Sequence, residues 1–149
     1  MKLAQLFVGL LFAGSMSIAA ADLEAWTDYD IGEGVSNVTT VKVDSNRIDT
    51  YLEGLSKTWA PANEVAIELG QIESYSIFVS ELANSGDFNV VLVVNMKDAS
   101  ALQPTKERYD AFMKAWGEAN QAIQDEIVPT YPGIRTIVGE YLMREITLK

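Results

Sequence analysis

The chain contains no cysteine and no histidine among its 149 residues. Without cysteine it has no disulfide, thiolate nucleophile, iron–sulfur cluster or c-type haem attachment. Without histidine it lacks the usual general base near neutral pH, a Ser-His-Asp triad, and histidine ligands for zinc or haem. We therefore expect no bound cofactor, and a domain that is stable through its core alone.

Other chemical motifs are also missing. The sequence contains no glycine-rich phosphate loop and no G-x-S-x-G nucleophile motif. The acidic stretch DYDIGEG at 28–34 lacks the glycine and the glutamate that an EF-hand loop requires at its sixth and twelfth positions, where Glu33 and Thr39 stand. We therefore expect no metal site.

Positive charge is scarce. Eleven Lys and Arg residues face 21 Asp and Glu residues, which gives a formal net charge of −10 at pH 7. Phosphate backbones and anionic membrane surfaces repel such a protein. This charge balance argues against a nucleic-acid partner, and against membrane attachment of the mature protein.

The first 21 residues have the pattern of a secretory signal peptide. Lys2 supplies the basic start, an apolar stretch covers 3–13, and the small residues Ala19–Ala21 fit a cleavage site before Asp22. The alternative is a retained membrane anchor, but the apolar stretch is shorter than the roughly 20 residues that a spanning helix needs. We therefore expect a periplasmic or secreted protein, and the loss of Lys2 leaves the mature net charge at −11.

The mature chain is long enough for one domain. Residues 22–36 are rich in Asp, Glu and Gly and lack sustained periodicity, which predicts an acidic N-terminal arm, loosely docked and pinned to the body by Trp26 and Tyr29. Residues 37–149 carry regular apolar patterns and are expected to form the folded domain.

Hydrophobic periodicity predicts four strands and two long helices in residues 37–149. Pro61 is expected to kink the first helix near Trp59–Ala60, and Thr105 to cap the second helix, which ends before Pro129. The expected elements, in chain order, are a strand at 37–43, a helix at 47–69, strands at 72–82 and 88–97, a helix starting after 105, and a strand at 136–148.

The order β-α-β-β-α-β predicts an α+β, ferredoxin-like fold, in which two helices cover one face of an antiparallel sheet. Right-handed crossovers place the first and third strands in the centre of the sheet. The third strand contains VVLVV at 90–94, which is apolar on both faces, although a strand with one wet face should alternate. Its second face could be covered by the arm, by a ligand or by a second copy. We expect a second copy, in a homodimer with a shared barrel.

The element order and the two-sided strands resemble the dimeric α/β-barrel superfamily over about residues 37–148. That superfamily includes antibiotic-biosynthesis-type monooxygenases, haem-degrading enzymes, stress-response barrel proteins and NIPSNAP-like proteins. The stretches TWAPANEVA and KERYDAFMKAWGEAN look like those of an uncharacterised secreted branch. The resemblance implies the fold and the dimer. It transfers no catalytic residue, and the histidine that ligates haem in the haem-degrading branch is absent.

Six side chains are candidates for lining a ligand pocket. Trp59 and Trp116 lie on the apolar stripes of the helices and would form an aromatic wall or pack in the core. Tyr75 and Asn95 are polar groups on strands. Glu140 and Arg144 alternate onto one face of the last strand, where the arginine would hold a carboxylate or pair with an acid. The full set is Trp59, Tyr75, Asn95, Trp116, Glu140 and Arg144.

These observations favour a protein that binds a small, largely apolar molecule, or a partner, between sheet and helices. One alternative is a cofactor-independent monooxygenase or isomerase, in which at least two of Tyr75, Asn95, Glu140 and Arg144 meet in one pocket. Another is a structural or assembly protein without catalysis.

Overall fold

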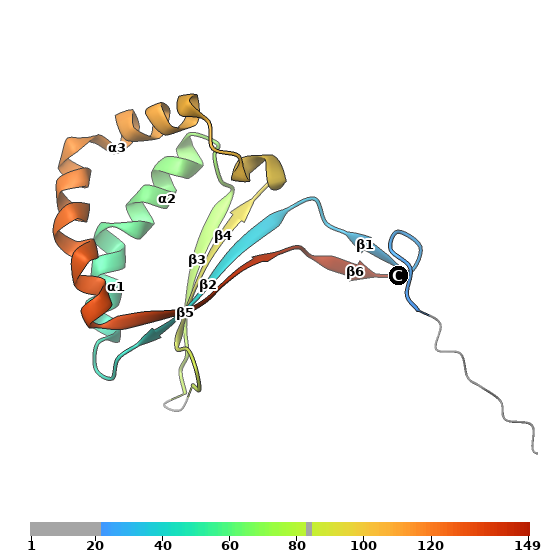
Figure 1. Cartoon of the computed structure of the whole chain (residues 1–149), viewed down its shortest axis with the longest axis horizontal. Coiled ribbons are helices and arrows are strands. Elements are labelled where there is room, and N and C mark those ends of the chain that lie inside the picture. Colours follow the sequence, from blue (N-terminus) through green and yellow to red (C-terminus); the bar gives the residue numbers. More distant parts are fainter. Residues whose placement is uncertain (1–21, 83–84) are drawn as a thin grey trace, which may run out of the picture.

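A computed structural model describes residues 22–82 and 85–149, so the expected signal peptide at 1–21 lies outside the described residues. Four antiparallel strands form the main sheet in the order β3-β4-β2-β5, and the helices lie on one of its faces (Figure 1). This is the ferredoxin-like fold that the element order predicted, with the first and third expected strands in the centre. The sheet strands are β2 (Val35–Val43), β3 (Ser74–Val79), β4 (Val90–Met96) and β5 (Arg135–Met143).

Helices α1 (Ile48–Lys57) and α2 (Trp59–Glu68) replace the single kinked helix expected at 47–69. The break falls at Thr58, whose φ of −127° and ψ of −74° are not helical. Pro61 therefore lies in the first turn of α2, where its missing N–H leaves no helical bond unmade. The Thr58 Oγ1 donates to the Gly54 carbonyl oxygen at 2.9 Å, which joins the two helices across the break.

Helix α3 (Lys106–Ile127) begins where Thr105 was expected to cap it, since the Thr105 side chain accepts a hydrogen bond from the Arg108 backbone N–H at 3.2 Å. It contains a break that the sequence analysis did not anticipate, at Gly117, with φ 75° and ψ 163°. Short 3-10 helices precede and follow α3: η1 (Ala99–Leu102) and η2 (Val128–Gly133). No helix in the described ranges 22–82 and 85–149 is long and apolar enough to cross a membrane.

The Gly117 break leads to a stability prediction. Its φ and ψ lie in a region that only glycine occupies readily, so Gly117→Ala is expected to lower the free energy of unfolding by about 1–3 kcal/mol. A Cβ at this position would contact nothing within 4 Å, so the cost would come from the backbone. Gly133→Ala is the matched control, because that position is equally open and has no positive φ. Urea unfolding measures the free energy of unfolding of both variants. Equal, small losses of that free energy in the two variants would contradict the prediction.

The core lies between the helices and the sheet. Its buried members come from β2, β4, α1 and η2: Val41, Val43, Tyr51, Leu55, Val90, Leu92 and Tyr131. In β4, Val90 and Leu92 face this core, while Val91 and Val93 alternate to the other side of the sheet. The helices therefore explain the apolar side chains on one face of VVLVV and leave those on the other face unexplained.

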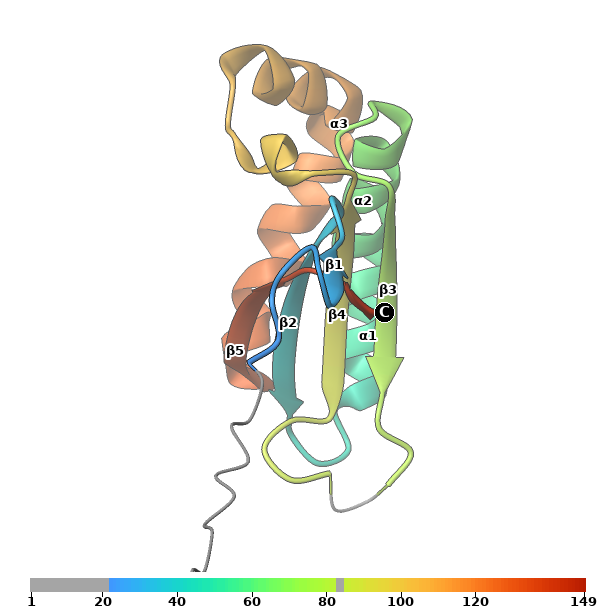
Figure 2. The same cartoon turned by 90° about the vertical axis from the view of Figure 1, so that its right-hand side faces the viewer.

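The long helices α1, α2 and α3 all lie behind the sheet in Figure 2 and leave its opposite side uncovered. Several apolar side chains on that side are exposed. Phe78, Tyr141 and Met143 are exposed by 57%, 53% and 54% of their surface. Pairing places Val91 beside Phe78, and Val93 beside Val38, which in turn lies opposite Tyr141. We call this surface the open face: Val38, Phe78, Val91, Val93, Tyr141 and Met143.

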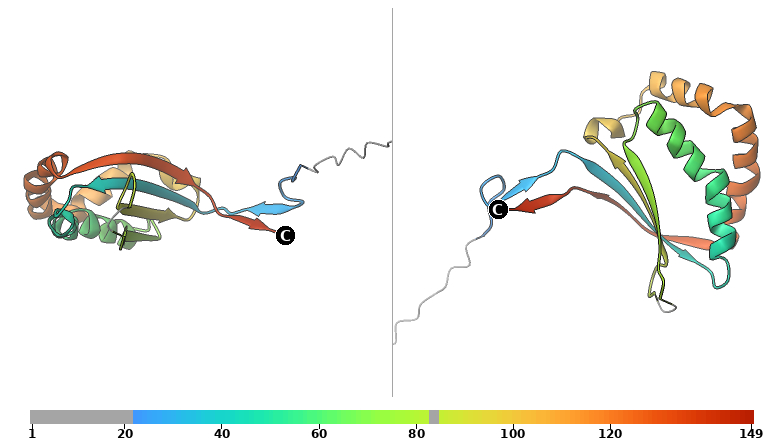
Figure 3. Two further views of the ribbon diagram at one scale, coloured as in Figure 1. Left: turned by 90° about the horizontal axis from the view of Figure 1, so that it is seen from below. Right: turned by 180° about the vertical axis from the view of Figure 1, so that it is seen from behind.

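The expected last strand is divided at Arg144–Glu145, and the N-terminal arm is more ordered than predicted. Strand β1 (Tyr29–Ile31) pairs antiparallel with β6 (Ile146–Leu148) in a two-stranded ribbon. The ribbon continues the β2–β5 pair and projects away from the sheet on the side opposite the helices (Figures 1 and 3). Trp26 and Tyr29 do not pin the arm to the body: Trp26 is 64% exposed and Tyr29 lies opposite Leu148.

Candidate functional site

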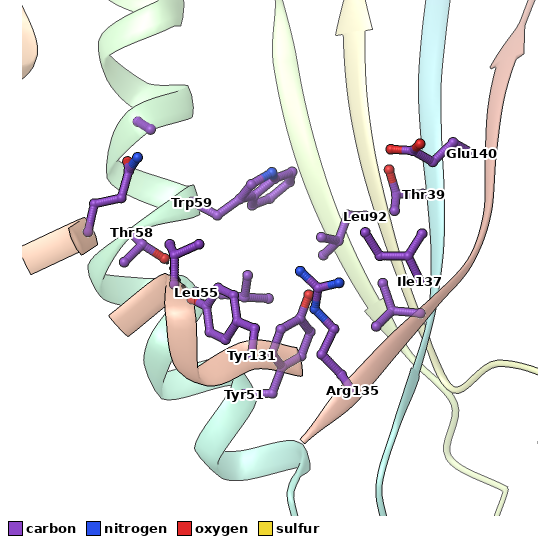
Figure 4. A pocket seen from close by; sticks show the side chains of 14 residues that line it. Thr39, Tyr51, Leu55, Thr58, Trp59, Leu92, Tyr131, Arg135, Ile137 and Glu140 are labelled. Atoms are coloured by element: carbon purple, nitrogen blue, oxygen red, sulfur yellow. Dashed lines mark hydrogen bonds between the residues drawn. The ribbon is translucent and has the colours of Figure 1, made fainter. Parts of the chain in front are cut away.

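A cavity of about 340 Å³ lies between the helices and the inner face of the sheet (Figure 4). Its lining comes from β2, β4 and β5 on one side and from α1, α2, α3 and η2 on the other. Most of the lining side chains are apolar, including Val41, Leu55, Trp59, Ala62, Leu92 and Ile137. Thr39, Thr58, Arg135 and Glu140 are among the polar groups that interrupt this surface.

Two tyrosines form one end of the cavity. The rings of Tyr51 and Tyr131 meet edge to face, with centroids 5.2 Å apart. The Tyr131 hydroxyl lies 2.7 Å from the Thr58 Oγ1, a pairing that fixes the position of its ring. A Cβ on Gly54 would lie 2.8 Å from Tyr131 Cε1, so this close approach requires glycine. Burial raises the pKa of both tyrosines above the ordinary value of 10.0, so both phenols stay protonated at neutral pH.

Arg135 extends from the start of β5 into this cavity. Its Cζ lies 5.5 Å from the Tyr131 ring centroid and 5.9 Å from that of Tyr51, within the range of a cation–π interaction. Its Nε is buried and has no hydrogen-bond partner among the described residues. A buried donor without a partner costs about 1–3 kcal/mol.

The sequence analysis missed Arg135, because the last strand was expected to start one residue later, at Thr136. The structure begins β5 at Arg135 and pairs that residue with Val43. The available signal was the two-residue spacing from Arg135 to Ile137, which places the two side chains on one face of a strand.

Glu140 lines the cavity because of a β-bulge. The β2–β5 register shifts between Thr40, opposite Gly139, and Val41, opposite Ile137, so one extra residue lies in β5. Beyond a bulge of this kind, each side chain points to the side of the sheet opposite to the one that strict alternation would give. Arg135, Ile137 and Glu140 therefore all line the cavity, whereas Tyr141 lies over Gly139 on the open face.

Of the six candidates from sequence, Trp59 and Glu140 line the cavity, and Tyr75 lies next to Trp59. The Trp59 and Tyr75 rings meet edge to face, with centroids 5.2 Å apart. The Tyr75 hydroxyl donates to Glu64 Oε1 of α2 at 3.1 Å, at an exposed position. Tyr75 thus supports the tryptophan that lines the cavity.

The other three candidates lie elsewhere. Asn95 is on the opposite side of the sheet from the helices, where its amide accepts from Ser36 Oγ at 2.7 Å and donates to Ser74 Oγ at 3.0 Å. Trp116 is buried in α3 and stacks with Phe112, at a centroid distance of 6.1 Å.

Arg144 lies beyond the end of β5, where Nη1 donates to the backbone carbonyls of Gly32 and Glu33 at 3.3 and 3.4 Å. It therefore joins the ribbon to the sheet and does not share a strand face with Glu140.

Metal binding has no structural support in the part of the chain that the structure describes. No group of three or more Asp or Glu side chains there is placed to hold an ion. What the site offers chemically is a partly open, largely apolar cavity with protonated phenols beside Arg135, a cation that has no ion-pair partner among the described residues.

Similarity to known proteins is found only among solved structures. No protein-family profile matches the chain, and no curated protein matches it. HapK from Hahella chejuensis is 12% identical, with a TM-score of 0.46, over 74% of this chain and 91% of that chain. A protein from Shewanella oneidensis is 14% identical, also with a TM-score of 0.46, over 80% of this chain and 99% of its own.

A third similar structure is a dimeric protein of unknown function with a ferredoxin-like fold from Bacteroides fragilis. It is 10% identical, with a TM-score of 0.42, over 78% of this chain and 98% of that one. These similarities concern only the arrangement of strands and helices. The strand order β3-β4-β2-β5 of this chain establishes that arrangement without them.

Proposed function

We propose that the protein binds a small, largely apolar molecule in the cavity between sheet and helices. The observation that carries this proposal is the space of about 340 Å³ that the side chains leave unfilled. Its volume lies at the lower end of the range for ligand pockets, about 300–1,000 Å³, and such pockets combine an apolar lining with a few polar groups.

Binding is better supported than catalysis. The enzyme alternative required at least two of Tyr75, Asn95, Glu140 and Arg144 to converge in one pocket. Of these four, only Glu140 lines the cavity. Asn95 bonds to serines on the opposite side of the sheet, and Arg144 bonds to the backbone of the arm.

The binding unit in this proposal is a homodimer joined through the open face. The open face, in which Phe78, Tyr141 and Met143 are each more than half exposed, is an apolar surface of the kind that soluble monomers avoid. A two-fold axis would set this surface against the same surface of a second copy. The ribbon β1–β6 projects on that side and carries two further exposed apolar residues, Ile146 and Leu148, so it would extend the contact.

We also propose that the protein acts outside the cytoplasm, in the periplasm or after secretion. The support is the signal-peptide pattern that ends at Ala21.

Native mass spectrometry of the protein purified from its own host tests the binding proposal. The expected species is a dimer of chains that begin at Asp22, with a small molecule retained in each subunit. Ala62→Phe is expected to abolish the retained mass, because the new ring would occupy the cavity that Ala62 lines from α2. The matched control is Ala115→Phe, at an exposed position of α3. Equal retention by both variants would contradict a ligand in this cavity.

A further inference from the structure

We infer that the molecule bound in the cavity is a monocarboxylate with an apolar body, whose carboxylate is held by the terminal nitrogens of Arg135. This inference rests on the proposed function and specifies its ligand class.

The first argument is that Arg135 has no counter-ion within the described chain. The ion pairs among the described residues join Lys57 to Glu53, Lys106 to Asp110, and Lys149 to Asp30. None of these residues lines the cavity. Glu140 is the acidic residue in the cavity lining, and it forms no ion pair with Arg135. A chain with 21 acidic residues thus leaves its cavity arginine unpaired. Charges placed in an apolar interior are normally paired, so a bound anion would complete the site.

The second argument is the geometry of the guanidinium group. The two tyrosine rings approach it at 5.5 and 5.9 Å, and its Nε is buried. The side chain hydrogen-bonds with the Tyr51 hydroxyl, and its Nη atoms are not among the buried unpaired atoms, so N–H donors remain for a ligand in the cavity. Figure 4 shows the guanidinium between Tyr131 and Leu92, pointing into the space below Trp59. Two parallel N–H donors of this kind match the two oxygens of a carboxylate.

The third argument concerns the rest of the ligand. Leu55, Trp59, Leu92 and Ile137 line the space beyond the guanidinium and favour an aromatic or aliphatic body. Glu140 lies at the far end of the lining from Tyr51 and Tyr131 (Figure 4), where its charge opposes a second anionic group. One carboxylate at the arginine end and an uncharged body therefore fit the cavity best.

Isothermal titration of the dimer with 2-naphthoate and with its neutral analogue 2-naphthamide tests the inference. The two probes share one ring system and differ in charge. Wild type is expected to bind the carboxylate about 10–100-fold more tightly, the range for a hydrogen bond to a charged group. Arg135→Met is expected to bring the two affinities to within about threefold of each other, with little change for the amide. Arg135→Lys keeps the charge without the planar fork, and should give an intermediate preference.

Arg47→Met is the matched control, because it removes one positive charge at an exposed position outside the cavity. It is expected to leave the carboxylate preference unchanged. Equal affinity of wild type for both probes, together with binding of neither probe by Ala62→Phe, would support a binding site in the cavity and contradict the inference of a carboxylate ligand. A preference that survives in both Arg135 variants would also overturn it. If neither probe binds wild type and no carboxylate is found in the purified protein, the inference fails together with the proposed function.

Discussion

Replacing Val93 with aspartate is expected to convert the proposed dimer into a monomer. Val93 lies at the centre of the open face, between Val38 of β2 and Ser76 of β3. A two-fold interface contains each substitution twice, and an unpaired carboxylate buried there costs at least about 2 kcal/mol per copy, so dimer affinity should fall about 1,000-fold. Light scattering coupled to size-exclusion chromatography measures the change.

The control for this experiment is Tyr109→Asp, which places the same charge at an exposed aromatic residue of α3 on the helix side. It is expected to remain a dimer. Val93→Asp should keep its circular dichroism spectrum, because the side chain faces away from the core of the single subunit. A dimer that persists in Val93→Asp would show that the open face is not the interface.

Replacing Trp116 with alanine is expected to cause the largest loss of folding stability, about 3–5 kcal/mol. Trp116 is 2% exposed and stacks on Phe112 within α3. Its removal would leave a cavity that the helix, already broken at Gly117, cannot refill without moving. Urea unfolding at one fixed protein concentration measures the loss, since a dimer gains stability with concentration.

Trp116→Phe is the informative companion variant. The indole Nε1 of Trp116 is buried without a hydrogen-bond partner among the described residues. Phenylalanine keeps most of the apolar contact and removes that unpaired donor. Trp116→Phe should therefore lower the free energy of unfolding by less than about half as much as Trp116→Ala. Equal losses in the two variants would mean that the indole N–H makes a bond that the structure does not show.

Local patterns were sufficient for most of the fold. β-branched residues located the central strands, and Thr105 located the start of α3, because capping and strand propensity act within a few residues. The break between α1 and α2 was expected one residue after its place at Thr58. The break in α3 at Gly117 was not expected, since a lone glycine within a helical pattern is compatible with an unbroken helix.

The candidate site was less predictable, and Arg135 and Arg144 show why. Sequence analysis singled out Arg144, within an otherwise apolar expected strand, and did not consider Arg135, which precedes that strand. The structure gives Arg144 a role in joining the arm to the sheet and places Arg135 over Tyr51 and Tyr131. Which arginine is enclosed depends on the contact of η2 with α1, and Thr58 and Tyr131 meet there across 73 positions of sequence.

The sequence by itself determined the absence of cysteine and histidine chemistry, the acidic charge, the ferredoxin-like order of elements and the apolar second face of β4. Each of these follows from composition or from short-range periodicity. The tertiary structure decided which side chains share the cavity. One β-bulge after Ile137 turns Glu140 toward the helices and Tyr141 toward the open face. A bulge is a property of strand pairing between distant segments, so no pattern within residues 135–143 could reveal it.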